Sequence, residues 1–188
     1  MKGSRALEWP ELAAVARELD NPRDRALFLM MVYTGARISE VLGLDVLDVR
    51  RPNGSIRSQI VYRRRVTKGR RESRAVDLHP DAAGALVVYL DRRLDGPVFL
   101  SSRRTRLSRV QAWRILHAAF ADAGLFDRVS PHSLRHSFAQ SLADRGVPLA
   151  VVQELLGHAD IRDTREYVEA RERSAAALSA VASLPPIE

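Results

Sequence analysis

The sequence predicts an α+β fold that is mainly α-helical and contains a small antiparallel sheet of about three strands. Apolar residues recur at helical spacing over most of the 188 residues, whereas β-branched residues alternate only between residues 46 and 78. Pro and Gly separate these segments and supply turns. With 46% hydrophobic residues, the chain is long enough to bury one core. We therefore expect a single domain over residues 1–188.

The first third of the chain is expected to form helices around a turn that carries an arginine. Residues 10–19 and 22–34 both have apolar residues at helical spacing, and Gly35 suits the end of the second helix. A third, short helix is expected over residues 38–44. Arg37 therefore falls on a turn between two elements that we expect to be buried.

The sheet and the later helices follow in separate blocks. Strands are expected over residues 46–49, 56–66 and 74–78, with turns at residues 52–54 and at Gly69. Helical patterns return from residue 80 onward. The predicted helices cover residues 80–92, 108–123, 133–144, 148–156, 161–170 and 174–184.

The segment from residue 50 to residue 74 is strongly basic. It holds ten Arg or Lys against one acid, Glu72, which is a local charge of +9 in a chain whose net charge is +7. A compact cationic segment on a nearly balanced body is typical of a surface that binds a polyanion. The alternative is a solvated basic loop.

Composition excludes several classes of protein. The chain has no cysteine, so disulfides, thiolate catalysis and Cys-type zinc sites are excluded. His and acidic residues do not occur together at metal-ligand spacing, and we expect no metal or other cofactor. No apolar run approaches the roughly 18 residues of a membrane span, and the first residues lack the apolar core of a signal peptide. A cytoplasmic, DNA-associated location is expected.

His132 and Arg135 occur three residues apart at a predicted helix start. If the helix begins at Ser133, Arg135 lies in its first turn, where backbone N–H groups and the helix dipole favour a phosphate. The planar guanidinium can also make two parallel bonds to phosphate oxygens. The alternative is a helix cap with a surface arginine. His158, after Gly157, has a similar alternative as an incidental residue beyond a helix end.

Tyr167 follows these residues and is a possible nucleophile. Tyrosine has a pKa near 10, so it needs a base or positive charge nearby to attack phosphorus near neutral pH. A single tyrosine on a helix is more often a packing residue, and the other candidates are Tyr33, Tyr62 and Tyr89.

Four segments together resemble the catalytic motifs of the tyrosine recombinase, or phage integrase, family. They are TGARISEVLGL at 34–44, TKGRRESRAVDL at 67–78, PHSLRHSFA at 131–139 and LGHADIRDTREY at 156–167. Their order and spacing agree over about residues 7–170. The resemblance implies the tyrosine recombinase catalytic fold and a site-specific recombinase that cleaves and rejoins double-stranded DNA through a 3′-phosphotyrosyl intermediate at Tyr167.

The resemblance also implies a role for each matching residue. Arg37 and Arg135 would hold the non-bridging oxygens of the scissile phosphate, with His158 as a further donor. Lys68 would protonate the leaving 5′ oxygen, and His132 would assist proton transfer at the nucleophile Tyr167. Glu40 would support the site by orienting a neighbouring residue. From the basic segment we expect DNA contacts by Arg63, Arg64, Arg65, Arg70, Arg71 and Arg74.

The chain departs from the family pattern at its beginning. It has almost nothing before Trp9, so we expect the N-terminal core-binding domain of the family to be absent. The chain is then either an excised fragment or a short single-domain member that resembles the inverting recombinases of fimbrial phase switches.

Two other functions and one structural question stay open at this point. The same motifs would suit a type IB topoisomerase-like nicking-closing enzyme, or a non-catalytic DNA-binding regulator on the same scaffold.

Recombination would require a homo-oligomer, such as a tetramer, on DNA. The amphipathic tail over residues 171–184 either docks on a neighbouring protomer or packs on its own domain.

Overall fold

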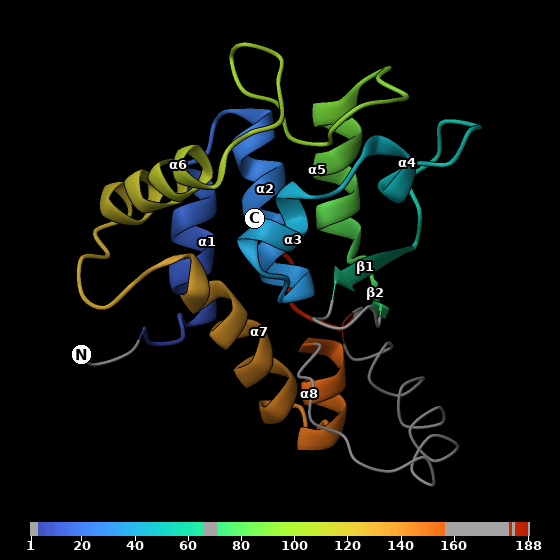
Figure 1. The fold of residues 1–188 in the computed structure, drawn as a ribbon. Helices are drawn as coiled ribbons and strands as arrows, with labels where there is room; N and C mark the ends of the chain where they lie inside the picture. The colour runs from blue at the N-terminus through green and yellow to red at the C-terminus, as the bar shows by residue number, and fades with distance from the viewer. Residues whose placement is uncertain (1–3, 66–70, 157–180, 182, 188) are drawn as a thin grey trace, which may run out of the picture.

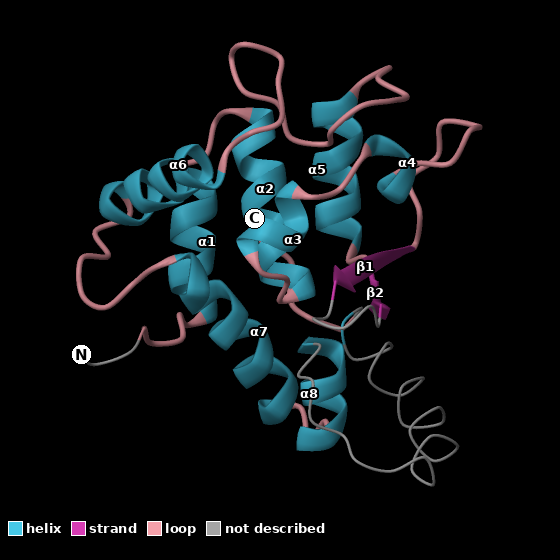
Figure 2. Cartoon of the chain, viewed as in Figure 1, coloured by secondary structure: helices cyan, strands magenta, loops and turns pink. Residues whose placement is uncertain are grey.

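The computed structural model describes residues 4–65, 71–156, 181 and 183–187. Within them the fold is mainly helical with one small antiparallel sheet, as the sequence predicts, and Figure 2 shows the two strands at one edge of the helices. The elements in chain order are α1 Trp9–Arg17, α2 Pro22–Thr34, α3 Ile38–Leu42, α4 Val46–Val49, β1 Gln59–Arg65, β2 Arg71–Asp77, α5 Pro80–Leu90, α6 Arg109–Asp122, α7 Pro131–Asp144 and α8 Leu149–Leu156.

Helix α2 forms the centre of the core. Every residue from Ala26 to Thr34 is buried, and the helix packs against α1, α5, α6 and α7 (Figure 1). Asn21 caps its start by accepting a 3.0 Å hydrogen bond from the backbone N–H of Arg23. Gly35 ends it in the left-handed conformation, with φ of 58°. Both bounds of this helix match the sequence prediction.

The sheet differs from the prediction by one strand. In the described residues β1 pairs only with β2, in an antiparallel register that places Tyr62 opposite Arg74. The strand expected over residues 46–49 is wrong, because this segment forms the helical turn α4. Asp45 precedes it, and the backbone N–H of Asp45 donates to Asp48 Oδ2 at 2.9 Å. This bond stabilises a helical turn in a four-residue segment with three apolar residues, which is too short for its pattern to distinguish a strand from a helix.

The later helices agree with the prediction except at the start of α7. That helix begins at Pro131, and the side chain of Ser130 caps it by accepting a 3.2 Å bond from the backbone N–H of His132. Arg135 therefore lies just beyond the first turn, rather than inside it as expected. The helix expected over residues 161–170, and most of the one over 174–184, lie outside the described residues.

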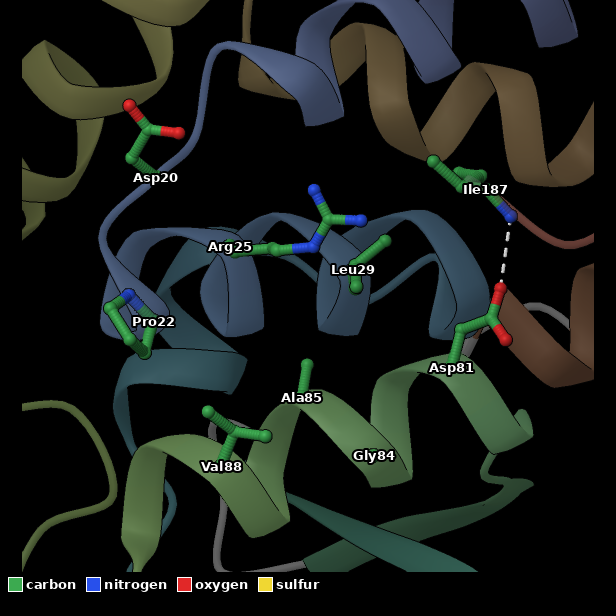
Figure 3. A pocket seen from close by; sticks show the side chains of 9 residues that line it. All are labelled: Asp20, Pro22, Arg25, Leu29, Asp81, Gly84, Ala85, Val88 and Ile187. Carbon is green, nitrogen blue, oxygen red and sulfur yellow. Dashed lines mark hydrogen bonds between the residues drawn. The ribbon is translucent and has the colours of Figure 1, made fainter.

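The described end of the chain packs on its own domain. Val181, Leu184 and Ile187 are buried in the common core. The carbonyl of Leu184 lies 3.1 Å from Nε2 of His79, and the backbone N–H of Ile187 donates to Oδ2 of Asp81 at 2.9 Å (Figure 3). For these residues, own-domain packing is the arrangement that the structure shows.

Figure 3 also shows a pocket beside this chain end, between α2 and α5. It has a volume of about 460 Å³, and its lining includes Arg25 and Leu29 of α2 and Gly84 and Val88 of α5. None of the predicted site residues lines it. Among the residues that the structure describes, no helix has both the length and the apolar character that a membrane span needs.

Candidate functional site

The turn after α2 holds Arg37 at the start of α3. Gly35 turns the chain away from α2, and the hydroxyl of Thr34 fixes the turn by accepting from the backbone N–H of Ala36 at 3.3 Å. The same hydroxyl donates to the carbonyl of Met30 at 2.6 Å. Arg37 follows this fixed turn, and its side chain is 36% exposed. The turn is thus rigid while the guanidinium that it carries reaches solvent.

Glu40 binds Arg37 in two ways. Its Oε2 accepts from the backbone N–H of Arg37 at 2.7 Å, and its Oε1 accepts from Nη1 of Arg37 at 3.3 Å. Burial acts to raise the pKa of Glu40, but the Arg37 backbone bond and the charges of Arg74 and Arg37 outweigh burial and hold that pKa below its usual range. Glu40 is therefore a carboxylate that contacts both the backbone and the guanidinium of Arg37.

Arg135 reaches the same turn from α7. The residue is 4% exposed. Its Nη1 donates to the carbonyl of Gly35 at 2.8 Å, and its Nη2 donates to the carbonyl of Leu156 at 2.7 Å. Arg37 and Arg135 are distant in sequence, but both are fixed to one turn, with the C-terminal end of α8 beside it.

His132 lies at the exposed N-terminal end of α7. Its ring meets that of His136 edge to face, with 4.7 Å between the ring centroids. Partial burial lowers the pKa of His132 below its ordinary 6.5, and the positive charges of His136, Arg135 and Arg37 lower it further. His132 is thus within electrostatic influence of both arginines. At neutral pH its imidazole is neutral and able to accept a proton.

Arg74 lies inside the protein. Its side chain is 8% exposed, and its guanidinium lies over the ring of Tyr62, 4.7 Å from the centroid. Nη2 donates to Oε2 of Glu40 at 3.1 Å, and Nη1 donates to the carbonyls of Thr34 and Leu155. In the described structure its contacts are therefore internal, whereas the charge pattern grouped it with the arginines expected to contact DNA.

The alternation of apolar residues along β2 is the sequence signal that could have predicted the inward position of Arg74. Val76 and Leu78 are buried, and successive side chains of a strand point to opposite faces, so Arg74 shares their side of the strand. Thr34 and Tyr62 also had no assigned role in the sequence, although the Tyr62 hydroxyl donates to Oγ1 of Thr34 at 3.1 Å and completes the network around the turn.

Several predicted site residues lie outside the described residues. These are Lys68, Arg70, His158 and Tyr167. Arg63, Arg64 and Arg65 belong to β1, and Arg71 belongs to β2. The two strands lead directly into and out of the segment 66–70, which contains Lys68.

The three tyrosines that competed with Tyr167 are packing residues. Tyr33 is completely buried, and burial together with the Asp81 carboxylate raises its pKa far above the ordinary 10.0. Burial raises the pKa of Tyr62 to about 12. The hydroxyl of Tyr89 accepts from the backbone N–H of Leu100 at 3.0 Å. Tyr33 and Tyr62, as buried phenols with raised pKa values, are poor nucleophiles, and the Tyr89 hydroxyl is engaged by the backbone.

The described residues include no group of three or more His, Cys, Asp or Glu that could hold a metal ion. The cationic cluster around the turn after α2 instead has the chemistry of a phosphate-binding site, with guanidinium donors and a neutral imidazole.

Comparison with known proteins agrees with this chemistry. The model of the phage integrase family matches residues 5–173. The chain is 42% identical over 157 residues to the tyrosine recombinase XerD of Mycobacterium leprae, and the match covers 77% of this chain and 47% of that protein. The chain thus spans about half the length of this relative.

Solved structures share the fold. The crystal structure of XerA recombinase superimposes with a TM-score of 0.73 at 27% identity, over 98% of this chain and 61% of that one. A lambda integrase tetramer bound to a Holliday junction gives a TM-score of 0.64 at 20% identity, over 87% of this chain and 49% of that one. The fold is therefore that of tyrosine recombinase catalytic domains, as the motifs implied.

Proposed function

The chain belongs to the phage integrase family, and from that premise we propose that it is a site-specific recombinase that cleaves and rejoins double-stranded DNA through a covalent bond to Tyr167. The observation that carries the proposal is that Arg135 donates to the carbonyl of Gly35 in the turn before Arg37, with His132 three residues before Arg135 on α7. Two guanidinium groups beside a neutral imidazole can bind a phosphate and receive a proton in one place.

The proposed reaction is a transfer of phosphorus from one oxygen to another. The Tyr167 hydroxyl oxygen forms a bond to phosphorus, and the bond from phosphorus to the 5′ oxygen breaks. The phenol proton passes to a base, for which His132 is suited, and the 5′ oxygen takes a proton from Lys68. Arg37 and Arg135 offset the negative charge on the non-bridging oxygens. The phosphotyrosyl bond retains the phosphodiester energy, so the reverse step rejoins the strand.

Tyr167 is the nucleophile in this proposal because the alternatives are committed elsewhere. The chain has four tyrosines, and Tyr33, Tyr62 and Tyr89 all serve packing and internal hydrogen bonds. Tyr167 also occupies the matching position in the motif that resembles the family.

We also propose which residues bind DNA, how copies of the chain assemble, and which residues form the catalytic domain. The basic arginines of β1 and β2 would bind the DNA backbone, with Arg63, Arg64, Arg65, Arg70 and Arg71 as the contact residues. Copies of the chain would assemble on DNA, an arrangement supported by the likeness to a lambda integrase that forms a tetramer on a Holliday junction. Residues 1–188 would form one catalytic domain, of which the family model matches residues 5–173.

The test is a suicide DNA substrate whose nick lets the 5′ leaving strand diffuse away and so traps the covalent intermediate. The unmodified protein is expected to form a protein–DNA adduct that resists denaturation. Tyr167→Phe is expected to bind the same DNA with unchanged affinity and form no adduct, and Tyr89→Phe is the matched control that keeps it. An adduct with Tyr167→Phe would show that another residue is the nucleophile.

A further inference from the structure

Arg74 joins four parts of the fold that surround the candidate site. From β2 its guanidinium reaches Glu40 on α3, the carbonyl of Thr34 at the end of α2 and the carbonyl of Leu155 near the end of α8. Tyr62 on β1 stacks beneath it. The Nε atom of Arg74 is buried and has no partner among the described residues. The hydrogen bonds of Arg74 to the described residues therefore come from its two terminal nitrogens.

Glu40 is shared between two arginines of different exposure. Oε2 accepts from Arg74 at 3.1 Å and Oε1 accepts from Arg37 at 3.3 Å. The Arg74 side chain is 8% exposed and that of Arg37 is 36% exposed. Solvent screens the Arg37 pair more strongly, because exposed ion pairs are weaker than buried ones. The ion pair with Arg74 therefore stabilises the Glu40 carboxylate more than the ion pair with Arg37 does.

From this arrangement we infer that Arg74 is a positioning residue that keeps Arg37 available for the scissile phosphate. The inference rests on the proposed function. Glu40, Arg37 and Arg74 together carry a net charge of +1. Without Arg74 the half-buried carboxylate has only Arg37 to neutralise it, since removal of one partner leaves a buried charge uncompensated. The Arg37 guanidinium then turns toward Glu40, the local charge falls to zero, and the phosphate loses one of its donors.

A purely structural role for Arg74 makes a different prediction. Its bonds to the Thr34 and Leu155 carbonyls hold α2 and α8 together, so its loss lowers stability under either interpretation. Only the positioning role depends on the charge of Glu40. Removal of that charge should therefore restore Arg37 in a protein that lacks Arg74, while it cannot replace the lost bonds to the backbone carbonyls.

The experiment measures the rate of covalent adduct formation on the suicide substrate for Arg74→Met, Glu40→Gln and the double variant. Arg74→Met is expected to slow adduct formation about 100-fold with little change in DNA affinity, which is the size of effect that a misplaced phosphate donor produces. The double variant is expected to recover at least about tenfold of that loss, because the amide oxygen introduced by Glu40→Gln can still accept from the Arg37 backbone N–H. Arg92→Met, which removes an exposed arginine beyond the end of α5, is the matched control with an unchanged rate.

The outcomes separate the inference from the proposed function. An unmodified protein that forms no adduct would contradict the proposed function itself. An active unmodified protein with equally slow single and double variants would overturn the positioning role, and so would an Arg74→Met variant at full rate. If Arg74→Met does not fold, as judged by circular dichroism, Arg74→Gln with and without Glu40→Gln gives the same comparison, because glutamine is polar but carries no charge.

Discussion

Arg135 of α7 donates a 2.8 Å hydrogen bond from Nη1 to the backbone carbonyl of Gly35. The bond ties the helix that carries one predicted phosphate-binding arginine to the turn that carries the other. Gly35 also lies against α7, where the ring of Phe138 occupies the space that a Cβ at residue 35 would need. The position of Arg37 therefore depends on a glycine that no side chain can replace without movement of α7.

Gly35→Ala is expected to lower the free energy of unfolding by about 3 kcal/mol, from the left-handed φ together with overpacking. The added Cβ would overlap the Phe138 ring and lie 2.9 Å from Cδ2 of Leu156. Gly54→Ala is the control, because Gly54 also has a positive φ, 86°, but no atom lies within 4 Å of its added Cβ. That variant should lose only about 1 kcal/mol. Urea denaturation measures both, and equal losses would contradict the packing argument.

Tyr33→Phe is expected to reduce stability and leave adduct formation intact. The Tyr33 hydroxyl lies 2.9 Å from Oδ2 of Asp81 and 2.9 Å from the carbonyl of Pro185. Loss of this donor should lower the free energy of unfolding by about 1–2 kcal/mol. Thermal unfolding and the suicide-substrate assay, run on the same preparation, provide the measurement. Loss of the adduct without loss of stability would make Tyr33 a candidate nucleophile.

The rate of adduct formation is expected to stay constant as pH falls through 6.5 and to decline only below it. Partial burial, followed by the charges of His136, Arg135 and Arg37, lowers the pKa of His132, so its neutral form persists to lower pH. His136→Asn should move the acid limb of the profile upward, because one positive influence on His132 is removed. An NMR titration of the imidazole Cε1–H signals checks the pKa directly. A His132 pKa above 6.5 in the unmodified protein would contradict the assignment.

The same lowered pKa has a consequence for stability. His132 binds a proton more weakly in the folded chain than in the unfolded chain, so its contribution favours folding above pH 6.5 and is lost as pH falls below that value. Glu40 acts in the same direction at lower pH, because its lowered pKa favours folding above 4.5 and that contribution is lost as the carboxylate takes up its proton.

DNA affinity is expected to fall steeply with salt, and the basic segment should set the slope. Arg64→Ala should reduce the slope of log affinity against log salt concentration by about one, the value for one lost phosphate contact. Arg92→Ala, outside the basic segment, should leave the slope unchanged. Fluorescence anisotropy with a labelled duplex at several salt concentrations gives both slopes. Equal slopes for the two variants and the unmodified protein would remove Arg64 from the interface.

Local signals in the sequence were sufficient for the helices with strong ends. Pro22 and Gly35 bound α2 as predicted, and Ser108 caps α6 by accepting from the backbone N–H of Gln111 at 3.2 Å. The segment of α4, with three apolar residues in four, has no such signals, because a run of that length fits a strand as well as one helical turn. The bond from the backbone N–H of Asp45 to Asp48 stabilises the helical turn there.

The site was predictable in its residue types and less so in its contacts. Motif order predicts Arg37, His132 and Arg135 together, and the structure ties Arg135 to the turn before Arg37, with His132 on the same helix as Arg135. The count of positive charges could not separate a solvent-facing arginine from an inward-facing one, so the contacts of Arg74 with Glu40 and α8 emerge only when β2 packs against the turn. Contacts of this kind depend on tertiary packing.

Arg135 donates hydrogen bonds to the backbone carbonyls of Gly35 and Leu156, which lie 100 and 21 residues away in the chain. Arg74 donates to the carbonyl of Leu155, 81 residues away. Contacts between residues so far apart in the chain form late in folding, after the local helices. A nascent or partly unfolded chain consequently holds the two site arginines in separate segments. The proposed capacity to break a DNA strand is therefore expected only of the completely folded protein.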